Sequence, residues 1–238
     1  MGTWNRLVNS IRTRGLKRTL HVILTILEDH CFDIKYKTNT IGQINSGDLD
    51  ISSENKHRSR GYGPTRARPF TKLITRLDFP SDSVFVDFGS GKGRTLILAS
   101  RFGFKKIVGV EFSHKLCEEA KKNLSIYRKK AGIDVDVEIF ESDVVDYEVR
   151  DDENVFFLFD PFDSVVMAAV LKNINISLEK KPRKIWLIYH YPKFHNIIVN
   201  QGNFVKLNEY HLGGNRFNVY VNNSYDYPQE VSSTHTSK

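Results

Sequence analysis

The segment Val84–Arg94 constrains the fold of this chain more than any other. It begins as a short apolar run, carries Asp87 near the end of that run, and then turns through alternating glycines at positions 89, 91 and 93. Residues 95–99 continue in a helical pattern. A strand, an acid, a glycine-rich turn and a helix open a nucleotide-binding α/β unit, in which bare main chain can approach a ligand. The sequence therefore predicts an α/β domain organised around this turn.

The spacing of the glycines separates three kinds of nucleotide-binding turn. A P-loop needs Ser or Thr after Gly-Lys, and here Gly93 follows Lys92. A dinucleotide fingerprint needs its third glycine where this chain has Arg94. The remaining pattern, Asp-x-Gly-x-Gly-x-Gly, resembles motif I of class I S-adenosylmethionine (SAM) methyltransferases, whose acid faces the ammonium of SAM directly or through water. A glycine-rich turn without a ligand has the same pattern and stays an alternative.

The periodicity of the remaining chain predicts a doubly wound, Rossmann-like α/β fold with a seven-stranded sheet and a C-terminal antiparallel hairpin. The hairpin turns around Gly213 and Gly214. The strands expected after the first are Lys106–Glu111, Asp134–Phe140, Asn154–Phe159, Ile185–His190, Phe204–Tyr210 and Arg216–Val221, and helices are expected at Arg68–Leu77, His114–Lys130 and Val165–Leu178.

An acid closes the second strand at Glu111, 18 residues after Gly93. At that distance a carboxylate is placed to accept hydrogen bonds from both ribose hydroxyls. The third strand ends near Asp143 and Val144. In the methyltransferase pattern the acid accepts from the adenine amino group and the next backbone N–H meets the ring. The alternative for Asp143 is a turn or helix-capping residue.

The fourth strand is apolar throughout, as expected of a central parallel strand, and it ends in Asp160-Pro161-Phe162. Ligands of doubly wound sheets lie at the carboxyl ends of the strands, so this group is expected to face the methyl of SAM. Asp160 and Phe162 are the predicted catalytic residues, and Asp160 and Pro161 are also placed in the cofactor site. His190 and Tyr191, at the end of the next strand, are secondary candidates for contact with the substrate.

These motifs together resemble a class I SAM-dependent methyltransferase over about residues 60–222. The residues that this resemblance assigns to the cofactor are Tyr62, Thr65, Asp87, Gly89, Ser90, Gly91, Gly93, Glu111, Phe112, Asp143, Val144, Asp160 and Pro161. Tyr62-Gly63-Pro64-Thr65 is similar to the Tyr-Gly-x-Thr loop of the non-SET nucleosomal lysine methyltransferases of the Dot type. The string Asp87–Arg94 with Gly109–Ser113 resembles, more closely, a group of small bacterial methyltransferases whose acceptors are largely undefined.

The end of the fourth strand departs from the Dot-type pattern. Asp160-Pro161-Phe162 resembles the [DNS]-P-P-[YF] motif of amino methyltransferases, but Phe162 stands where that motif has its second proline. In those enzymes the acid or amide and the proline carbonyl accept N–H bonds from the target nitrogen, and the aromatic ring packs on the target. The resemblance therefore implies a nitrogen acceptor, which Asp160 would orient. No metal is expected, because His, Cys and carboxylates do not cluster at ligand spacing.

Composition and charge indicate the size of the core, the cellular compartment and the kind of partner. Of the 238 residues, 40% are hydrophobic, which is enough for a sizeable core, and no run is long enough to span a bilayer. Two cysteines, Cys31 and Cys117, give no disulfide framework, which favours a reducing, cytoplasmic location. Residues 1–76 hold 14 Lys and Arg against 6 Asp and Glu, so the net charge of +7 lies on the N-terminal third. Such a segment suits nucleic acid or a membrane surface, although a solvated helix face is the commoner explanation.

The chain is expected to divide into a basic helical extension and loop at 1–60, a SAM-binding domain at 61–222 and a loose tail at 223–238. Within the extension, Thr3–Asp29 has the periodicity of an amphipathic helix, favoured as a packed cap, and Cys31–Arg60 is polar and suits a lid or binding loop.

The predicted function is SAM-dependent methyl transfer to a nitrogen of a protein or small molecule. The alternatives are a nucleic-acid base methyltransferase and a non-catalytic SAM-binding module, with a nicotinamide-dependent oxidoreductase as a distant fourth.

Overall fold

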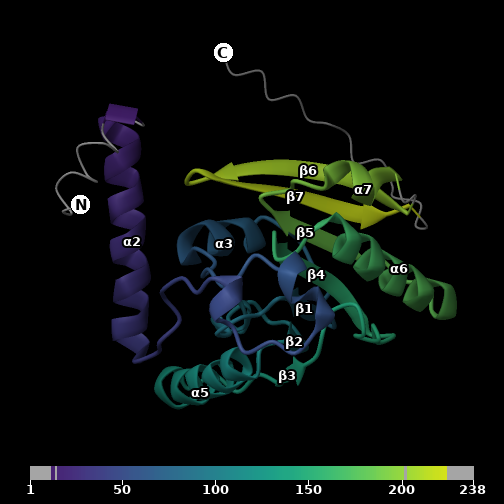
Figure 1. Cartoon of the computed structure of the whole chain (residues 1–238), viewed down its shortest axis with the longest axis horizontal. Coiled ribbons are helices and arrows are strands. Elements are labelled where there is room, and N and C mark those ends of the chain that lie inside the picture. The colour runs from purple at the N-terminus through teal and green to yellow at the C-terminus, as the bar shows by residue number, and fades with distance from the viewer. Residues whose placement is uncertain (1–11, 14, 201–202, 224–238) are drawn as a thin grey trace.

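The computed structural model describes residues 12–13, 15–200 and 203–223 of the chain (Figure 1). Its centre is a seven-stranded sheet in the order β3-β2-β1-β4-β5-β7-β6. The first five strands are parallel, and β7 runs antiparallel between β5 and β6. The strands are β1 Val84–Phe88, β2 Lys106–Glu111, β3 Val137–Glu141, β4 Glu153–Phe159, β5 Trp186–His190, β6 Phe204–Leu212 and β7 Asn215–Asn222. The predicted fold class, including the C-terminal hairpin, is confirmed.

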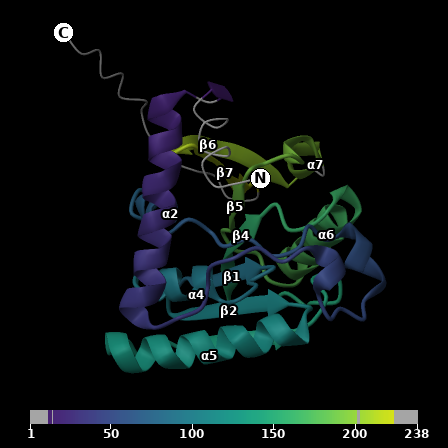
Figure 2. The ribbon, with the colours of Figure 1, turned by 60° about the vertical axis from the view of Figure 1, so that its left-hand side comes forward.

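Helices cover both faces of the sheet, as Figure 2 shows for α4 and α5 on one side and α6 on the other. Their bounds are α2 Leu16–Tyr36, α3 Ala67–Ile74, α4 Arg94–Ala99, α5 His114–Ala131, α6 Ser164–Lys180 and α7 His195–Asn200, with short 3-10 turns η1 Ser46–Asp48 and η2 Glu54–Arg58. The helix α7 had no counterpart in the sequence prediction. No described helix is long and apolar enough to cross a membrane.

The central strand β1 is buried on both faces because its side chains alternate between two apolar cores. Val86 and Phe88 pack into the core beneath α6, and Phe85 packs into the core formed with α3, α4 and α5. Burial on both sides explains why the run has no alternation of apolar and polar residues. The strand order reverses between β1 and β4, so the carboxyl ends of these strands border the crevice where doubly wound sheets bind ligands.

The N-terminal helix differs from its prediction at its carboxyl end. The sequence predicted Thr3–Asp29, whereas α2 continues to Tyr36 and ends where Lys37 adopts a left-handed conformation (φ 58°). The extra turns are held by aromatic packing, because the rings of Phe32 and Tyr36 lie 6.4 and 4.7 Å from that of Tyr127 in α5. Residues 3–11 lie outside the described part of the chain.

The expectation of a packed cap holds for one half of α2 only. Phe32 is buried against the domain, but Leu16, Leu20 and Leu27 are exposed. Figure 1 shows α2 standing beside the sheet, with its C-terminal end near α5. Residues 224–238, which contain most of the predicted tail, also lie outside the described part, and Asn222 is the last residue of β7.

Candidate active site

A cavity of about 580 Å³ lies at the carboxyl ends of β1, β2 and β4. Its size is within the range usual for small-molecule sites. Almost all residues predicted from the sequence line it, namely Tyr62, Thr65, Asp87, Gly89, Ser90, Gly91, Glu111, Phe112, Asp143, Val144, Asp160, Pro161, Phe162 and Tyr191. Gly93 and His190 do not.

The glycine turn forms one wall of the cavity and is packed against two other segments. Gly89 and Gly91 have positive φ values of 82° and 53°, which disfavour other residues. A Cβ at Gly91 would lie 2.3 Å from the ring of Tyr62, and one at Gly89 would lie 2.9 Å from Cβ of Pro161. The turn therefore needs glycine for its conformation and for its close contact with both neighbours.

Gly93 does not line the cavity and packs at the start of α4. It precedes α4 with a φ of 78°, and a Cβ there would lie 3.1 Å from Cβ of Ala120 in α5. The third glycine of the motif thus allows close packing between the start of α4 and α5. The sequence spacing does not show which of the three glycines faces the cavity. In the structure all three also have positive φ values.

Asp87 is the most unusual group of the site. Its carboxyl group is 2% exposed, and no Lys, Arg or His among the described residues pairs with it. Burial raises the pKa of Asp87 to about 8, the nearby Glu111 adds to this, and a hydrogen bond with Thr95 opposes it. The hydroxyl of Ser90, three residues on, is also buried without a hydrogen-bond partner in the described structure. These two groups fit a ligand that brings a cation and a hydrogen-bonding group.

Glu111 is held in place by the main chain around it. The backbone N–H groups of Gly91 and Ser113 donate to its two carboxylate oxygens, each at 2.9 Å. Burial nevertheless raises the pKa of Glu111. The backbone N–H of Phe112 also interacts with this carboxylate, which has about four acceptor positions in all, so acceptor capacity remains for a ligand hydroxyl. The arrangement thus fits the predicted ribose contact.

Asp143 is engaged by the N-terminal segment. Its carboxylate accepts from the hydroxyl of Ser53, from Nδ2 of Asn55 at 2.9 Å and from the backbone N–H of Val145 at 3.1 Å. It therefore acts as a turn residue, the alternative considered above, while still lining the cavity beside Val144. The polar sequence before position 60 did not identify individual site residues. Loop residues from this segment complete the wall, namely Gln43, Ile44, Asn45, Leu49, Asn55 and Ser59.

Tyr62 and Thr65 lie in the wall as expected. The hydroxyl of Tyr62 donates to the carbonyl of Thr40, so its ring is fixed over the glycine turn. The hydroxyl of Thr95 donates to that of Thr65 at 3.0 Å, which joins the loop to α4. Both hydrogen bonds hold the side chains of Tyr62 and Thr65 against the domain. The ring of Tyr62 then lines the cavity.

Asp160 is the charged centre of the opposite wall. It has a positive φ of 41° and is 7% exposed. Its Oδ2 lies 2.5 Å from Nζ of Lys193 and 3.1 Å from Nε of Arg60, and the hydroxyl of Tyr189 donates to Oδ1 at 3.3 Å. The sequence analysis did not identify Arg60 or Lys193 as site residues. Lys193 could have been identified, because it lies two residues after the candidate Tyr191. Phe162 lines the cavity but is 5% exposed and packs mainly in the core.

His190 is not available for contact with a substrate, contrary to the prediction. It is fully buried, its ring stacks on Phe159 and Phe217 at 4.2 Å, and it is hydrogen bonded to Asn215 at 3.0 Å. Burial lowers the pKa of His190 to about 3, so the ring is neutral. The reason is that β7 pairs with β5 and covers this position. Tyr191, which has a φ of 54° and is partly exposed, does line the cavity.

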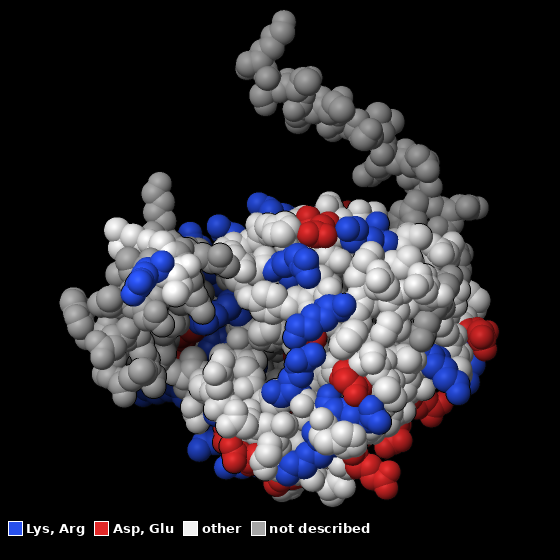
Figure 3. Space-filling view, turned by 45° about the horizontal axis from the view of Figure 1, so that its top comes forward, with Lys and Arg blue, Asp and Glu red and all other residues white. Residues whose placement is uncertain are grey.

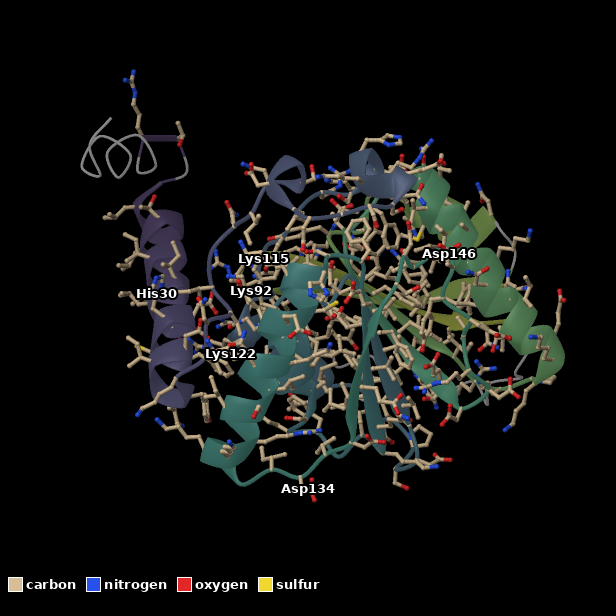
Figure 4. All side chains as sticks on the ribbon, turned by 60° about the horizontal axis from the view of Figure 1, so that its bottom comes forward. His30, Lys92, Lys115, Lys122, Asp134 and Asp146 are labelled. Carbon is tan, nitrogen blue, oxygen red and sulfur yellow. The ribbon has the colours of Figure 1, made fainter. Side chains whose placement is uncertain are left out.

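Two basic residues at the end of the glycine turn contact helices, and one of them, Arg94, also lines the cavity. Lys92 is between α2 and α5 in Figure 4, and its Nζ is 3.0 Å from Glu119 of α5. Arg94 is 1% exposed and pairs with Asp29 of α2 at 2.8 Å. Both residues fix the turn against helices, which the sequence spacing did not predict. The described residues contain no group of three or more His, Cys, Asp or Glu able to hold a metal ion.

Comparison with known proteins supports the resemblance to methyltransferases that the sequence motifs indicate. Residues 50–151 match the family described as "Histone methylation protein DOT1". A trans-aconitate 2-methyltransferase of Variovorax paradoxus (strain S110) is 36% identical over 66 residues, which are 27% of this chain. The chain thus spans about a quarter (26%) of the length of this curated relative.

Solved structures share the fold at low sequence identity. A ribosomal protein L11 methylase from Lactobacillus delbrueckii subsp. bulgaricus superposes with a TM-score of 0.52 and 15% identity, covering 68% of this chain and 80% of the other. The PH0226 protein from Pyrococcus horikoshii OT3 gives a TM-score of 0.50 and 17% identity, covering 73% and 93%. The resemblance to class I SAM-dependent methyltransferases is therefore confirmed, and this chain has their fold.

Proposed function

We propose that this protein is a SAM-dependent methyltransferase that transfers a methyl group to a nitrogen of a protein or small-molecule acceptor. The observation that carries the proposal is Asp87, a buried carboxyl group at the cavity wall without a cation beside it among the described residues. An ionised carboxylate in a protein interior is normally paired, and the ammonium of SAM is a suitable partner for the ionised form.

The other residues of the cavity suit the rest of the cofactor. Glu111 keeps free acceptor positions for the ribose hydroxyls, and Gly89 and Gly91 expose main chain to the methionine part. Asp143 and Val144 border the place expected for adenine. When bound, SAM supplies an electrophilic methyl carbon on a good leaving group. The protein then has mainly to align the acceptor and exclude water.

The acceptor is expected at the carboxyl end of β4. Within the described part of the chain, Oδ1 of Asp160 has one hydrogen-bond partner, the hydroxyl of Tyr189 at 3.3 Å, so it retains capacity to accept an N–H from an amine. The carbonyl of Pro161, which the motif would use for the same purpose, accepts the backbone N–H of Arg60 at 3.1 Å and keeps one acceptor position. Orientation of the acceptor is assigned to the side chain of Asp160, with Phe162 as a wall.

The named relatives favour a protein or a small molecule as acceptor. By their descriptions, the matched family methylates histones, the Lactobacillus structure is a methylase of a ribosomal protein, and the Variovorax relative methylates trans-aconitate. A nucleic-acid base is the second candidate. Figure 3 shows Lys and Arg side chains gathered along the middle of one face, which would attract phosphates, and such binding should weaken steeply with salt.

The test is transfer of an isotope-labelled methyl group from SAM to separated protein, small-molecule and nucleic-acid fractions of a bacterial extract. Label in the protein or small-molecule fraction, reduced by Asp160→Ala and unchanged by Lys180→Gln on the distant α6, supports the proposal. Label in the nucleic-acid fraction favours the second candidate. Absence of transfer to every fraction, with SAM binding intact, would favour a non-catalytic SAM-binding module.

A further inference from the structure

Two cations share one carboxylate at the acceptor end of the cavity. Arg60 precedes the loop of Tyr62, and Lys193 lies between β5 and α7, yet both reach Oδ2 of Asp160. A buried carboxylate needs a single positive partner to balance its charge. The cluster of Arg60, Asp160 and Lys193, called here the Asp160 cluster, therefore carries an excess positive charge.

Both cations keep donors that the protein does not use. The side chains of Arg60 and Lys193 are 45% and 50% exposed, and both line the cavity. Among the described residues, none accepts a hydrogen bond from the guanidinium of Arg60, and the ammonium of Lys193 has one acceptor, Asp160. A guanidinium has five N–H donors and an ammonium has three, so the cluster can bind a further oxyanion.

The main chain holds Arg60 in this position independently of its side chain. The backbone N–H of Arg60 donates to the carbonyl of Pro161 at 3.1 Å, and Ser59 forms a β-bridge with Phe162. A preorganised donor loses less entropy on binding than one carried by a free loop. This favours a binding role for Arg60 over a chance surface ion pair.

Nearby acids do not cancel the excess charge. Asp163 is paired with Arg58 at 2.8 Å. Asp87 and Glu111 belong to the part of the cavity assigned to the cofactor, and Asp143 is held by Ser53 and Asn55. In the described part of the chain, the Asp160 cluster thus presents one carboxylate and two cations at the acceptor end, which suits an acceptor that is itself anionic.

We propose that the methyl acceptor is a small molecule with a carboxylate or phosphate group that binds Arg60 and Lys193. The inference rests on the proposed function and narrows its acceptor class. It also explains why Asp160 is doubly paired in a site where one partner would satisfy it.

The experiment is a calorimetric titration of small anions into the full chain, with and without saturating S-adenosylhomocysteine, at constant ionic strength. The probes are succinate, glycerol phosphate and the neutral diamide of succinate. The variants are Arg60→Gln, Lys193→Gln and Asp160→Asn. Lys180→Gln is the matched control, since Lys180 is also an exposed, ion-paired lysine but lies on α6.

The proposal predicts saturable binding of at least one anion and none of the diamide. Affinity should fall roughly tenfold or more in Arg60→Gln and in Lys193→Gln, as expected for loss of a charge-assisted hydrogen bond, and stay unchanged in Lys180→Gln. Asp160→Asn should strengthen anion binding, because it removes the competing carboxylate. A purely structural ion pair predicts no such gain.

Each remaining outcome has a defined meaning. Preference for succinate or for glycerol phosphate identifies the anionic group. Failure of both anions to bind, or equal binding of the diamide, would overturn the proposal. Absence of S-adenosylhomocysteine binding to the wild-type chain would instead contradict the proposed function. The anion titration without that ligand would still decide whether the Asp160 cluster is an anion site.

Discussion

The guanidinium of Arg94 lies 2.8 Å from the carboxylate of Asp29, and both side chains are almost completely buried. The same guanidinium donates to the hydroxyl of Thr40 at 2.9 Å and lies 4.8 Å from the ring centre of Phe32. Arg94 is the first residue of α4, directly after the glycine turn. One side chain therefore attaches the N-terminal helix α2 to the segment that forms the cofactor wall.

Arg94→Ala should reduce the free energy of unfolding by about 3–5 kcal/mol, because it leaves the buried carboxylate of Asp33, 3.8 Å from the guanidinium of Arg94, without a cation among the described residues. Asp29 keeps Arg66, at 2.6 Å. The matched control is Arg68→Ala, which removes the exposed pair with Glu28 and should change stability by about 0–1 kcal/mol. Urea denaturation followed by circular dichroism measures both, and equal effects would show that the buried pair is unimportant.

Gly91→Ala should abolish binding of S-adenosylhomocysteine. The added Cβ would meet the ring of Tyr62 at 2.3 Å, and the residue would keep a positive φ. Gly103→Ala is the control, because Gly103 has a positive φ of 73° but open space around it. That variant should lose about 1–2 kcal/mol of stability and bind the ligand normally. Normal binding by Gly91→Ala would mean that Tyr62 moves freely away from the turn.

Ligand binding should be coupled to release of a proton. Burial raises the pKa of Asp87 to about 8, so the carboxyl group is mostly protonated in the free protein near pH 7. A bound ammonium favours the carboxylate, and affinity for SAM should therefore rise as the pH increases toward about 8. Calorimetry in buffers of different ionisation enthalpy measures the proton count directly. A heat independent of the buffer would argue against contact between Asp87 and the ligand's cation.

Asp87→Asn should separate stability from ligand binding. In the unfolded chain Asp has a pKa of about 3.9, so between about pH 4 and about pH 8 the folded protein holds a proton that the unfolded chain lacks. This group's contribution to stability therefore falls as pH rises through that window. The variant should have a flatter pH profile, be more stable than wild type near pH 8 without ligand, and fail to bind SAM. Thermal unfolding across pH tests this, and parallel profiles would contradict it.

The part of the site that could be predicted from the sequence is the part built from local geometry. Asp87, Gly91 and Glu111 lie on consecutive strand–turn–helix segments, where spacing along the chain fixes the position of a residue in the fold. Asp160 was found for the same reason, since it directly follows the apolar strand β4.

The remaining part depends on contacts between segments far apart in the chain. Arg60 and Lys193 come from irregular loops, and no periodicity indicates that they meet at Asp160. The prediction for His190 is wrong because the end of a parallel strand is not always accessible, and Phe217 of β7 covers His190. The predicted N-terminal helix ends too early because the last turns of α2 are stabilised by packing on Tyr127 and not by local propensity.

The most direct test of the central claim is a calorimetric titration of S-adenosylhomocysteine into the wild-type chain and into Glu111→Gln, with NAD as the control ligand. The variant keeps the size of the side chain but removes the charge that accepts from Gly91 and Ser113. Saturable binding of S-adenosylhomocysteine by the wild type, weakened at least about tenfold in Glu111→Gln and absent for NAD, is the predicted result. Binding of NAD, or equal binding of S-adenosylhomocysteine by both chains, would contradict the assignment of the cavity as a SAM site.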